Sequence, residues 1–131
     1  MLLIAVSLAA TAAGVVACGE EGVSSSLNPQ QKEAAALFDE RCSGCHTLSV
    51  AGTQGSATNV RTREYKDGPN FNQRHETVNC VLYAIRNGGF SSGPMPQNIV
   101  NGEEAELLAK FVSENSAPAT AGGKVPDCPA G

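Results

Sequence analysis

Apolar residues recur at helical spacing in three stretches of the chain, 29–42, 76–86 and 101–115. A period of about 3.6 residues places these side chains on one face of a helix, where they can pack against another element. In the first stretch, the ring of Phe38 is expected to pack on a neighbouring helix. The pattern predicts three helices.

Local signals mark the ends of these helices. Asn28 suits the N-cap of the first helix, and Pro29 suits its first turn. The second helix should stop before the two glycines that follow Asn87, because glycine readily adopts left-handed caps. Asn101, with Glu104 three residues later, resembles a capping box for the last helix.

The segments between the helices have a different composition. Residues 47–67 are polar and rich in Gly, Thr and Ser, without convincing periodicity, so we expect a long loop that is held in place by a function. Residues 90–96 include two prolines and a glycine, which exclude regular structure there.

Residues 1–17 are apolar or small, and the first charged residue is Glu20. A helix of this length would reach about 25 Å, which is marginal for crossing a bilayer. An export leader therefore explains the stretch better than a permanent membrane span. The sequence around Cys18 resembles a bacterial lipobox, in which the cysteine is lipidated and begins the mature protein. Ordinary cleavage that leaves Cys18 free is the alternative.

The chain is thus expected to have four parts: a lipoprotein-type leader at 1–17, a flexible tether at 18–28, a folded domain at 29–116 and a tail at 117–131. The tether is rich in Ser and Gly and too polar to pack. Several acyl chains on Cys18 would anchor the domain stably at a membrane surface.

Composition narrows the range of functions. At 131 residues, the chain has room for one small domain and its tails. It has no Trp, two Tyr and four Phe, and a large apolar cofactor would add core surface that these side chains do not supply. The formal net charge of −4 argues against nucleic-acid binding. Five cysteines in so short a chain indicate an oxidising compartment.

Cys42 and Cys45, followed at once by His46, carry the strongest chemical signal. Two thiols at this spacing can add to the vinyl groups of a haem, and the histidine can reach the iron from the same side. A redox C-x-x-C or half of a zinc site would use similar residues. Zinc would need a second ligand pair at similar spacing, and the sequence has no other C-x-x-C and no H-x-x-x-H, while a thioredoxin-like site would need a βαβ context. We predict one covalently attached haem c.

Met95 is the best candidate for the remaining axial position on the iron. It is the only methionine outside the leader, and it stands between two prolines in a loop that could present its thioether to a fixed point. Water and His75 are the alternatives. The charged neighbours of His75 suggest a solvated or capping residue instead.

Pro69 offers a carbonyl group without a competing N–H donor. This carbonyl would suit the Nδ1–H of His46 and would orient the imidazole. The tetrapeptide 68–71, Gly-Pro-Asn-Phe, could equally form a simple turn.

Cys80 and Cys128 remain once the haem motif and the leader are assigned the other three cysteines. We expect them to form a disulfide that ties the tail to the domain, with two unpaired thiols as the alternative.

Together these residues resemble a small monohaem cytochrome c with one histidine and one methionine ligand. The likeness rests on Cys42-x-x-Cys45-His46, on Gly68-Pro69-Asn70 and on Gly93-Pro94-Met95-Pro96 before a final amphipathic helix, and it covers about residues 29–115. It implies an all-α fold of three to five helices around one haem, with the first and last helices crossing. It also implies thioether bonds at Cys42 and Cys45, ligation by His46 and Met95, and Pro69 as the acceptor from His46.

Two features depart from this family. The sequence has no lysine ring of the mitochondrial kind, which leaves docking on an acidic partner without support, and the Cys80–Cys128 pair is not part of the common pattern.

The resemblance implies an electron carrier rather than an enzyme. The expected route runs from a quinol-oxidising complex to a terminal oxidase, at the outer face of the bacterial cytoplasmic membrane, where lipid and tether keep the protein near its partners. The alternatives are a fixed haem c subunit of a larger respiratory or dehydrogenase complex, and an open-site haem peroxidase or sensor using His75.

Overall fold

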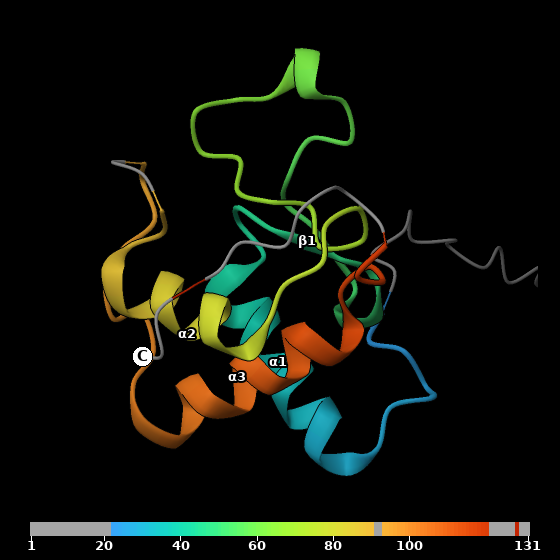
Figure 1. Ribbon diagram of the computed structural model, residues 1–131. Coiled ribbons are helices and arrows are strands. Elements are labelled where there is room, and N and C mark those ends of the chain that lie inside the picture. The colour runs from blue at the N-terminus through green and yellow to red at the C-terminus, as the bar shows by residue number, and fades with distance from the viewer. Residues whose placement is uncertain (1–21, 91–92, 121–127, 129–131) are drawn as a thin grey trace, which may run out of the picture.

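The computed structural model describes residues 22–90, 93–120 and 128 of the chain. The predicted leader at 1–17 and the lipidation candidate Cys18 lie outside these residues. Within them, three α-helices form the body of the domain: α1 (Pro29–Cys42), α2 (Val78–Asn87) and α3 (Gly102–Asn115) (Figure 1). The all-α prediction is confirmed. None of the described helices is both long and apolar enough to span a bilayer.

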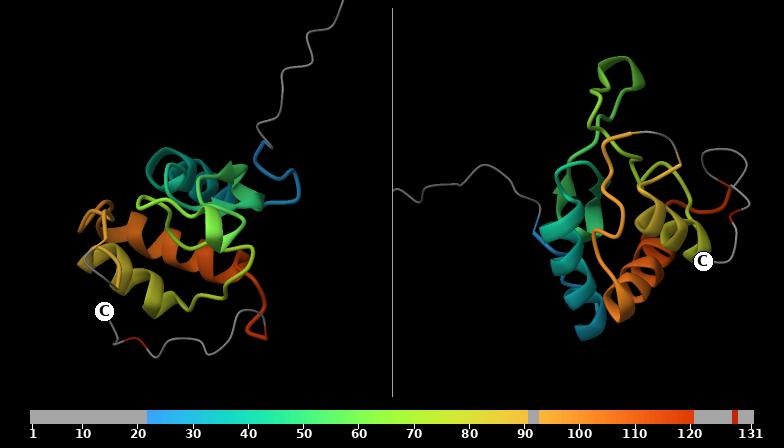
Figure 2. Two further views of the ribbon diagram at one scale, coloured as in Figure 1. Left: turned by 90° about the horizontal axis from the view of Figure 1, so that it is seen from above. Right: turned by 90° about the vertical axis from the view of Figure 1, so that its left-hand side faces the viewer.

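Helices α1 and α3 cross and pack at the centre of the domain, and α2 packs on α3 (Figures 1 and 2). Ala34 on α1 and Ala109 on α3 are completely buried, and such small side chains let two helices approach closely. Phe38 and Phe111 are each 1 % exposed and supply most of the aromatic core. The core role predicted for Phe38 is confirmed.

The start of α1 has the predicted signals. The Asn28 side chain accepts a hydrogen bond from the N–H of Gln31 at 2.9 Å, and the Gln31 side chain accepts one from the N–H of Asn28 at 3.2 Å. This reciprocal pair satisfies two backbone donors that a helix start would otherwise leave free.

The start of α3 differs from the prediction. Asn101 is the N-cap, but its side chain makes no capping bond and instead donates from Nδ2 to the carbonyl of Asn98 at 3.3 Å. The capping box expected with Glu104 is therefore wrong, because the amide of Asn101 is used by the preceding turn.

Helix α2 begins two residues later than predicted. Thr77 is its N-cap and accepts a hydrogen bond from the N–H of Cys80 at 3.3 Å, which excludes Glu76 from the helix. Its other end matches the prediction: Gly88 adopts the left-handed conformation, with φ of 72°, and caps Ala84.

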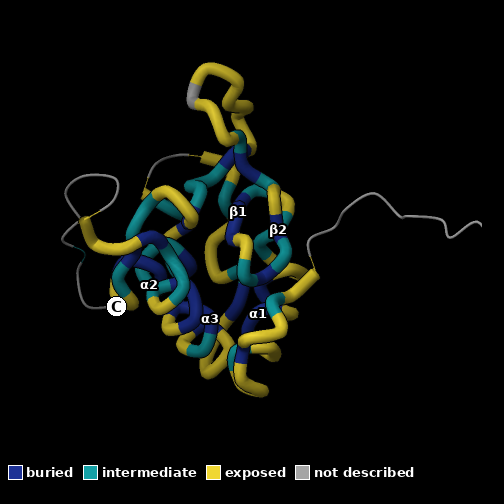
Figure 3. Tube along the Cα trace, turned by 90° about the vertical axis from the view of Figure 1, so that its right-hand side faces the viewer, coloured by how far each residue is buried: buried dark blue, intermediate teal, exposed yellow. Residues whose placement is uncertain are grey.

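Residues 47–67 contain more structure than the predicted loop. Strands β1 (Thr47–Leu48) and β2 (Thr53–Gln54) pair antiparallel across the short 3₁₀ helix η1 (Ser49–Ala51), and a second one, η2 (Val60–Thr62), follows. Strands of two residues are too short to show a period in the sequence. Beyond them, the exposed segment 61–66 projects from the body of the domain (Figures 1 and 3).

Both ends of the described domain pack more tightly than expected. Leu27, assigned to the flexible tether, is buried in the core, and the nearby N–H of Ser24 donates to the carbonyl of Val50 at 2.9 Å. Ala117, assigned to the tail, is also buried, and its N–H donates to the carbonyl of Phe71 at 2.8 Å. The burial of Leu27 corrects the expectation that the whole tether is too polar to pack, and the bond of Ala117 holds the chain just beyond the predicted end of the domain.

The structure joins Cys80 to Cys128 by a disulfide bond that spans 48 residues of sequence. Cys80 is fully buried on α2, so the bond connects the C-terminal tail directly to the core.

Candidate haem-binding site

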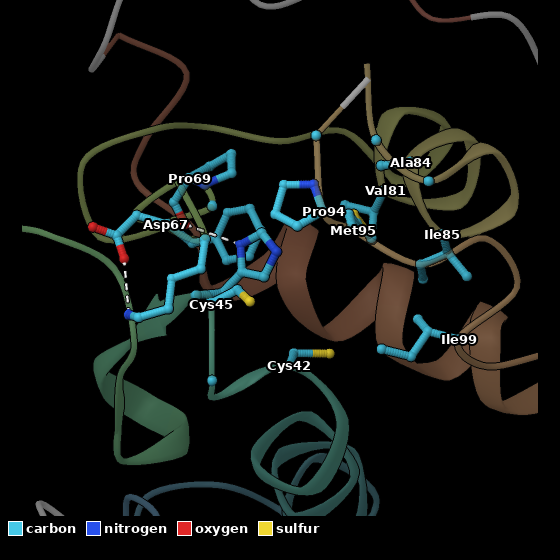
Figure 4. Close-up of a pocket in the computed structure, with 18 of the residues that line it drawn as sticks. Cys42, Cys45, Asp67, Pro69, Val81, Ala84, Ile85, Pro94, Met95 and Ile99 are labelled. Carbon is cyan, nitrogen blue, oxygen red and sulfur yellow. Dashed lines mark hydrogen bonds and ion pairs between the residues drawn. The ribbon is translucent and has the colours of Figure 1, made fainter. Parts of the chain in front are cut away.

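A cavity of about 490 Å³ receives side chains from all three helices and from the loops between them. Its volume lies in the range of roughly 300–1,000 Å³ that is usual for ligand pockets. Cys42, Cys45, His46 and Met95 all line it, although they are far apart in the sequence. Figure 4 shows the two cysteine sulfurs pointing into the same space, with Met95 above them.

A tight turn at the end of α1 presents the two thiols and the imidazole together. The N–H groups of Cys45 and His46 both donate to the carbonyl of Cys42, at 3.2 and 3.0 Å. Gly55 packs against this turn so closely that a side chain there would collide with the carbonyl of Ser43. Its N–H donates to the carbonyl of His46 at 3.1 Å, which holds the turn in place.

The ring of His46 is held by three neighbours. Nδ1 lies 3.1 Å from the carbonyl oxygen of Pro69. A carbonyl can only accept, so Nδ1 carries the proton and Nε2 is the nitrogen left to bind a metal. The ring stacks on Phe71, with centroids 4.9 Å apart and 7° between the planes. A side chain at Gly68 would overlap the imidazole.

Electrostatics favour the neutral form of His46. Burial lowers its pKa below the ordinary value, while the hydrogen bond to Pro69 acts in the opposite sense. A neutral imidazole is the form that ligates iron.

The environment of Cys42 argues against a redox C-x-x-C site. Burial, assisted by the neighbouring Cys45, raises the pKa of the Cys42 thiol to about 12. Redox-active cysteines of this motif have a lowered pKa, which generates the reactive thiolate. A zinc site is also disfavoured, because no group of three or more His, Cys, Asp or Glu among the described residues could hold a metal ion.

The loop carrying Met95 is fixed against the end of α2. The N–H of Asn98 donates to the carbonyl of Ile85 at 2.8 Å, and Gln97 Nε2 donates to the carbonyl of Asn87 at 3.4 Å. A side chain at Gly88 would lie 2.8 Å from the carbonyl oxygen of Met95, so the loop needs a glycine there. These contacts place the Met95 thioether on the cavity wall (Figure 4).

His75, the alternative axial ligand, is directed elsewhere. Its Nδ1–H donates to the carbonyl of Ala117 at 2.8 Å, and the residue is not part of the cavity lining. In the structure, the alternative ligand His75 therefore lies outside the set of residues that surround the cavity.

The rest of the cavity fits a large apolar group with acidic substituents. Val81, Ala84, Ile85 and Ile99 line the wall opposite the cysteines (Figure 4). The cationic side chains on the lining are Arg41, Arg63, Lys66 and Arg74, which suit the carboxylates of a haem. Two thiols, a neutral imidazole and a thioether are also the donor set that a haem c needs.

Two residues that support the site were not singled out from the sequence. Phe71 backs the imidazole of His46. Thr53 is 2 % exposed, and its hydroxyl donates to the carbonyl of His46 at 3.3 Å and accepts from the N–H of Leu48 at 3.0 Å. Phe71 follows the Gly-Pro-Asn segment directly, whereas nothing in the sequence marks Thr53.

The family model for cytochrome c matches residues 31–116, more than half of the chain. No curated protein matches the chain. The matched region includes Cys42, Cys45, His46 and Met95, and it agrees with the helical fold and with the cavity they share. In this family haem c is bound covalently and used for electron transfer. The chain belongs to the cytochrome c family.

Proposed function

We propose that the protein is a single-haem electron carrier in which His46 and Met95 are the two axial ligands of the iron. The observation that carries this proposal is that one cavity receives both cysteines, the oriented imidazole and the only methionine among the described residues. Bound haem supplies a one-electron ferric–ferrous couple.

The surroundings of both proposed ligands favour electron transfer over catalysis. Pro69 and Phe71 hold His46, and the contacts of Gly88 and Asn98 hold the loop of Met95. Ligands that are fixed before the electron arrives need little rearrangement afterwards. With His75 bonded to the backbone of Ala117, no histidine among the described residues stands ready as a distal acid or base.

The proposed setting is the outer face of the cytoplasmic membrane, with electrons received from a quinol-oxidising complex and passed to a terminal oxidase. The apolar stretch 1–17 and the lipobox-like sequence at Cys18 support this setting, because haem c attached to an exported lipoprotein would stay close to membrane-bound redox partners.

The ligand assignment is tested with the haem-loaded Met95→Ala variant. Wild-type ferric protein should be low-spin and show the methionine–iron charge-transfer band, which Met95→Ala should lack while keeping covalent haem. Ile99→Ala is the matched control, because it also removes an apolar side chain from the cavity lining but takes no proposed ligand. Persistence of the band in Met95→Ala would refute the assignment.

The membrane setting has its own test. Cys18→Ala should move the expressed protein from the membrane fraction to the soluble fraction without changing its absorption spectrum. Equal membrane association of wild type and variant would contradict lipid anchoring at Cys18.

A further inference from the structure

Glu76 is a buried carboxyl group on the lining of the haem cavity. Its side chain is 5 % exposed, and its Oε1 lies 2.6 Å from Nε of Arg74. The backbone N–H of Glu76 donates to the hydroxyl of Ser116 at 3.2 Å, just beyond the end of α3. These contacts hold the residue against the domain, so the carboxyl group cannot readily turn to solvent.

The other two carboxyl groups that line the cavity, among the described residues, are stabilised by solvent or by hydrogen bonds. Glu64 is 69 % exposed, and the side chain of Asp67 is 5 % exposed. Asp67 accepts hydrogen bonds from the N–H of Glu64 at 2.9 Å and from Lys66 Nζ at 3.1 Å, and these bonds hold the pKa of Asp67 below its ordinary value. Glu76 is instead paired with Arg74. The side chain of Arg74 is 39 % exposed, so water partly screens its charge.

Burial consequently raises the pKa of Glu76 above its ordinary value of 4.5, although the charges of Arg74 and His75 act in the opposite sense. Among the residues that the structure describes, the other charged side chains that line the cavity are those of Arg41, Arg63, Glu64, Lys66 and Asp67. Two buried carboxyl groups on one cavity thus have pKa values displaced in opposite directions. Asp67 stays ionised, and Glu76 is poised to exchange a proton.

We propose that Glu76 takes up one proton from solvent when the cytochrome accepts one electron, and returns that proton to solvent when the electron leaves. The electron comes from a one-electron donor and adds one negative charge to the cavity, and the proton on the Glu76 carboxylate offsets it. This inference rests on haem-based electron transfer, but it does not depend on the proposed partners or on the membrane setting.

The size of the effect follows from Coulomb's law. A unit charge about 10 Å away, at an effective dielectric constant of about 20, shifts a pKa by roughly one unit. Because linkage is reciprocal, the reduction potential must then fall as pH rises between the pKa values of Glu76 in the oxidised and reduced protein. For one electron, a pKa shift of one unit corresponds to a total fall in potential of about 59 mV across this range.

The test is a potentiometric titration of the haem-loaded full chain at a series of pH values. Wild type should show a sloping region above pH 4.5, and Glu76→Gln, which mimics the protonated carboxyl group, should lose that region and keep the higher potential of the acid side. Glu64→Gln removes a carboxylate from the same lining at an exposed position and should keep the wild-type slope. An unchanged slope in Glu76→Gln would overturn the proposal.

A second measurement needs no variant. Reduced-minus-oxidised infrared difference spectra of wild type, recorded within the sloping region, should contain the C=O band of a protonated carboxyl group that shifts when glutamate is labelled with ¹³C. A difference spectrum without a label-sensitive carboxyl band would overturn the proposal even if Glu76→Gln failed to fold.

The two titration failures are distinguishable. If wild type has a reversible one-electron couple and Glu76→Gln does not change its pH dependence, only the proposal of proton uptake is refuted. The lack of any reversible couple in wild type would refute the proposed electron carrier as well.

Discussion

The imidazole of His46 and the ring of Phe71 lie face to face, with 7° between their planes and 4.9 Å between their centroids. Phe71 also meets Phe38 edge-on, with centroids 6.0 Å apart. One aromatic side chain thus connects the proposed proximal ligand to the core of α1. Phe71 is 8 % exposed, so it acts within the packed interior.

Replacing Phe71 by leucine should therefore weaken the domain. Aromatic pairs contribute about 0.5–1.5 kcal/mol each beyond their buried area, so Phe71→Leu should lower the free energy of unfolding by roughly 1–3 kcal/mol for its two pairs. Denaturant unfolding of the haem-loaded protein measures the change. Phe90→Leu is the control, because Phe90 also stacks on a ring but is 53 % exposed, and its effect should be much smaller. Equal losses would contradict a structural role for the stack on His46.

Gly68→Ala should impair haem incorporation. A methyl group at this position overlaps the imidazole of His46, which must then leave the carbonyl of Pro69. We expect a lower ratio of haem to protein in the pyridine haemochrome assay. Gly44→Ala lies within the haem motif itself, but the added methyl group meets no atom within 4 Å, so its haem content should stay near wild type. Full haem loading of Gly68→Ala would show that His46 can be oriented without this close approach.

Loss of the Cys80–Cys128 disulfide should destabilise the fold by about 2–4 kcal/mol, because the bond closes a loop of 48 residues in the unfolded chain. Cys128→Ser is preferable to a change at Cys80, which is fully buried. Urea unfolding should show the variant insensitive to a thiol reductant, whereas wild type should fall to the level of the variant when reductant is added. If reductant left wild type unchanged, the bond would not contribute to stability.

Asp67 should make the protein sensitive to acid. Hydrogen bonds from the N–H of Glu64 and from Lys66 hold the pKa of Asp67 below its ordinary value of 3.8. As pH falls through that range, the unfolded chain binds the proton first, so the stability that Asp67 contributes at higher pH is lost. Asp67→Asn should be less stable than wild type near neutral pH, and the difference should shrink on acidification.

Asp39→Asn removes the same kind of carboxyl group at an exposed position and is the control for this experiment. A constant difference between wild type and Asp67→Asn across the acid range would contradict the lowered pKa.

Features whose chemistry is local were predictable from the sequence. Asn28 and Pro29 start α1 through contacts within one turn, and the haem motif places Cys42, Cys45 and His46 within the short segment 42–46. The Met95 loop was recognisable because two prolines exclude regular structure.

Features that depend on contacts distant in sequence were not predictable. The stack of Phe71 on His46 forms only when the segment after Pro69 runs beside β1. The errors at helix ends have a different cause, because neighbouring groups compete for the same side chains: Glu76 is paired with Arg74 instead of starting α2, and the amide of Asn101 bonds backward to Asn98. Burial of Leu27 likewise depends on core surface supplied by other segments of the chain.

An optical redox titration of the haem-loaded full chain tests the central claim most directly. A carrier with His46 and Met95 as fixed ligands should give one reversible transition that fits a single-electron Nernst curve and overlays in the oxidative and reductive directions. A transition that is irreversible, or that does not fit one electron, would contradict the account.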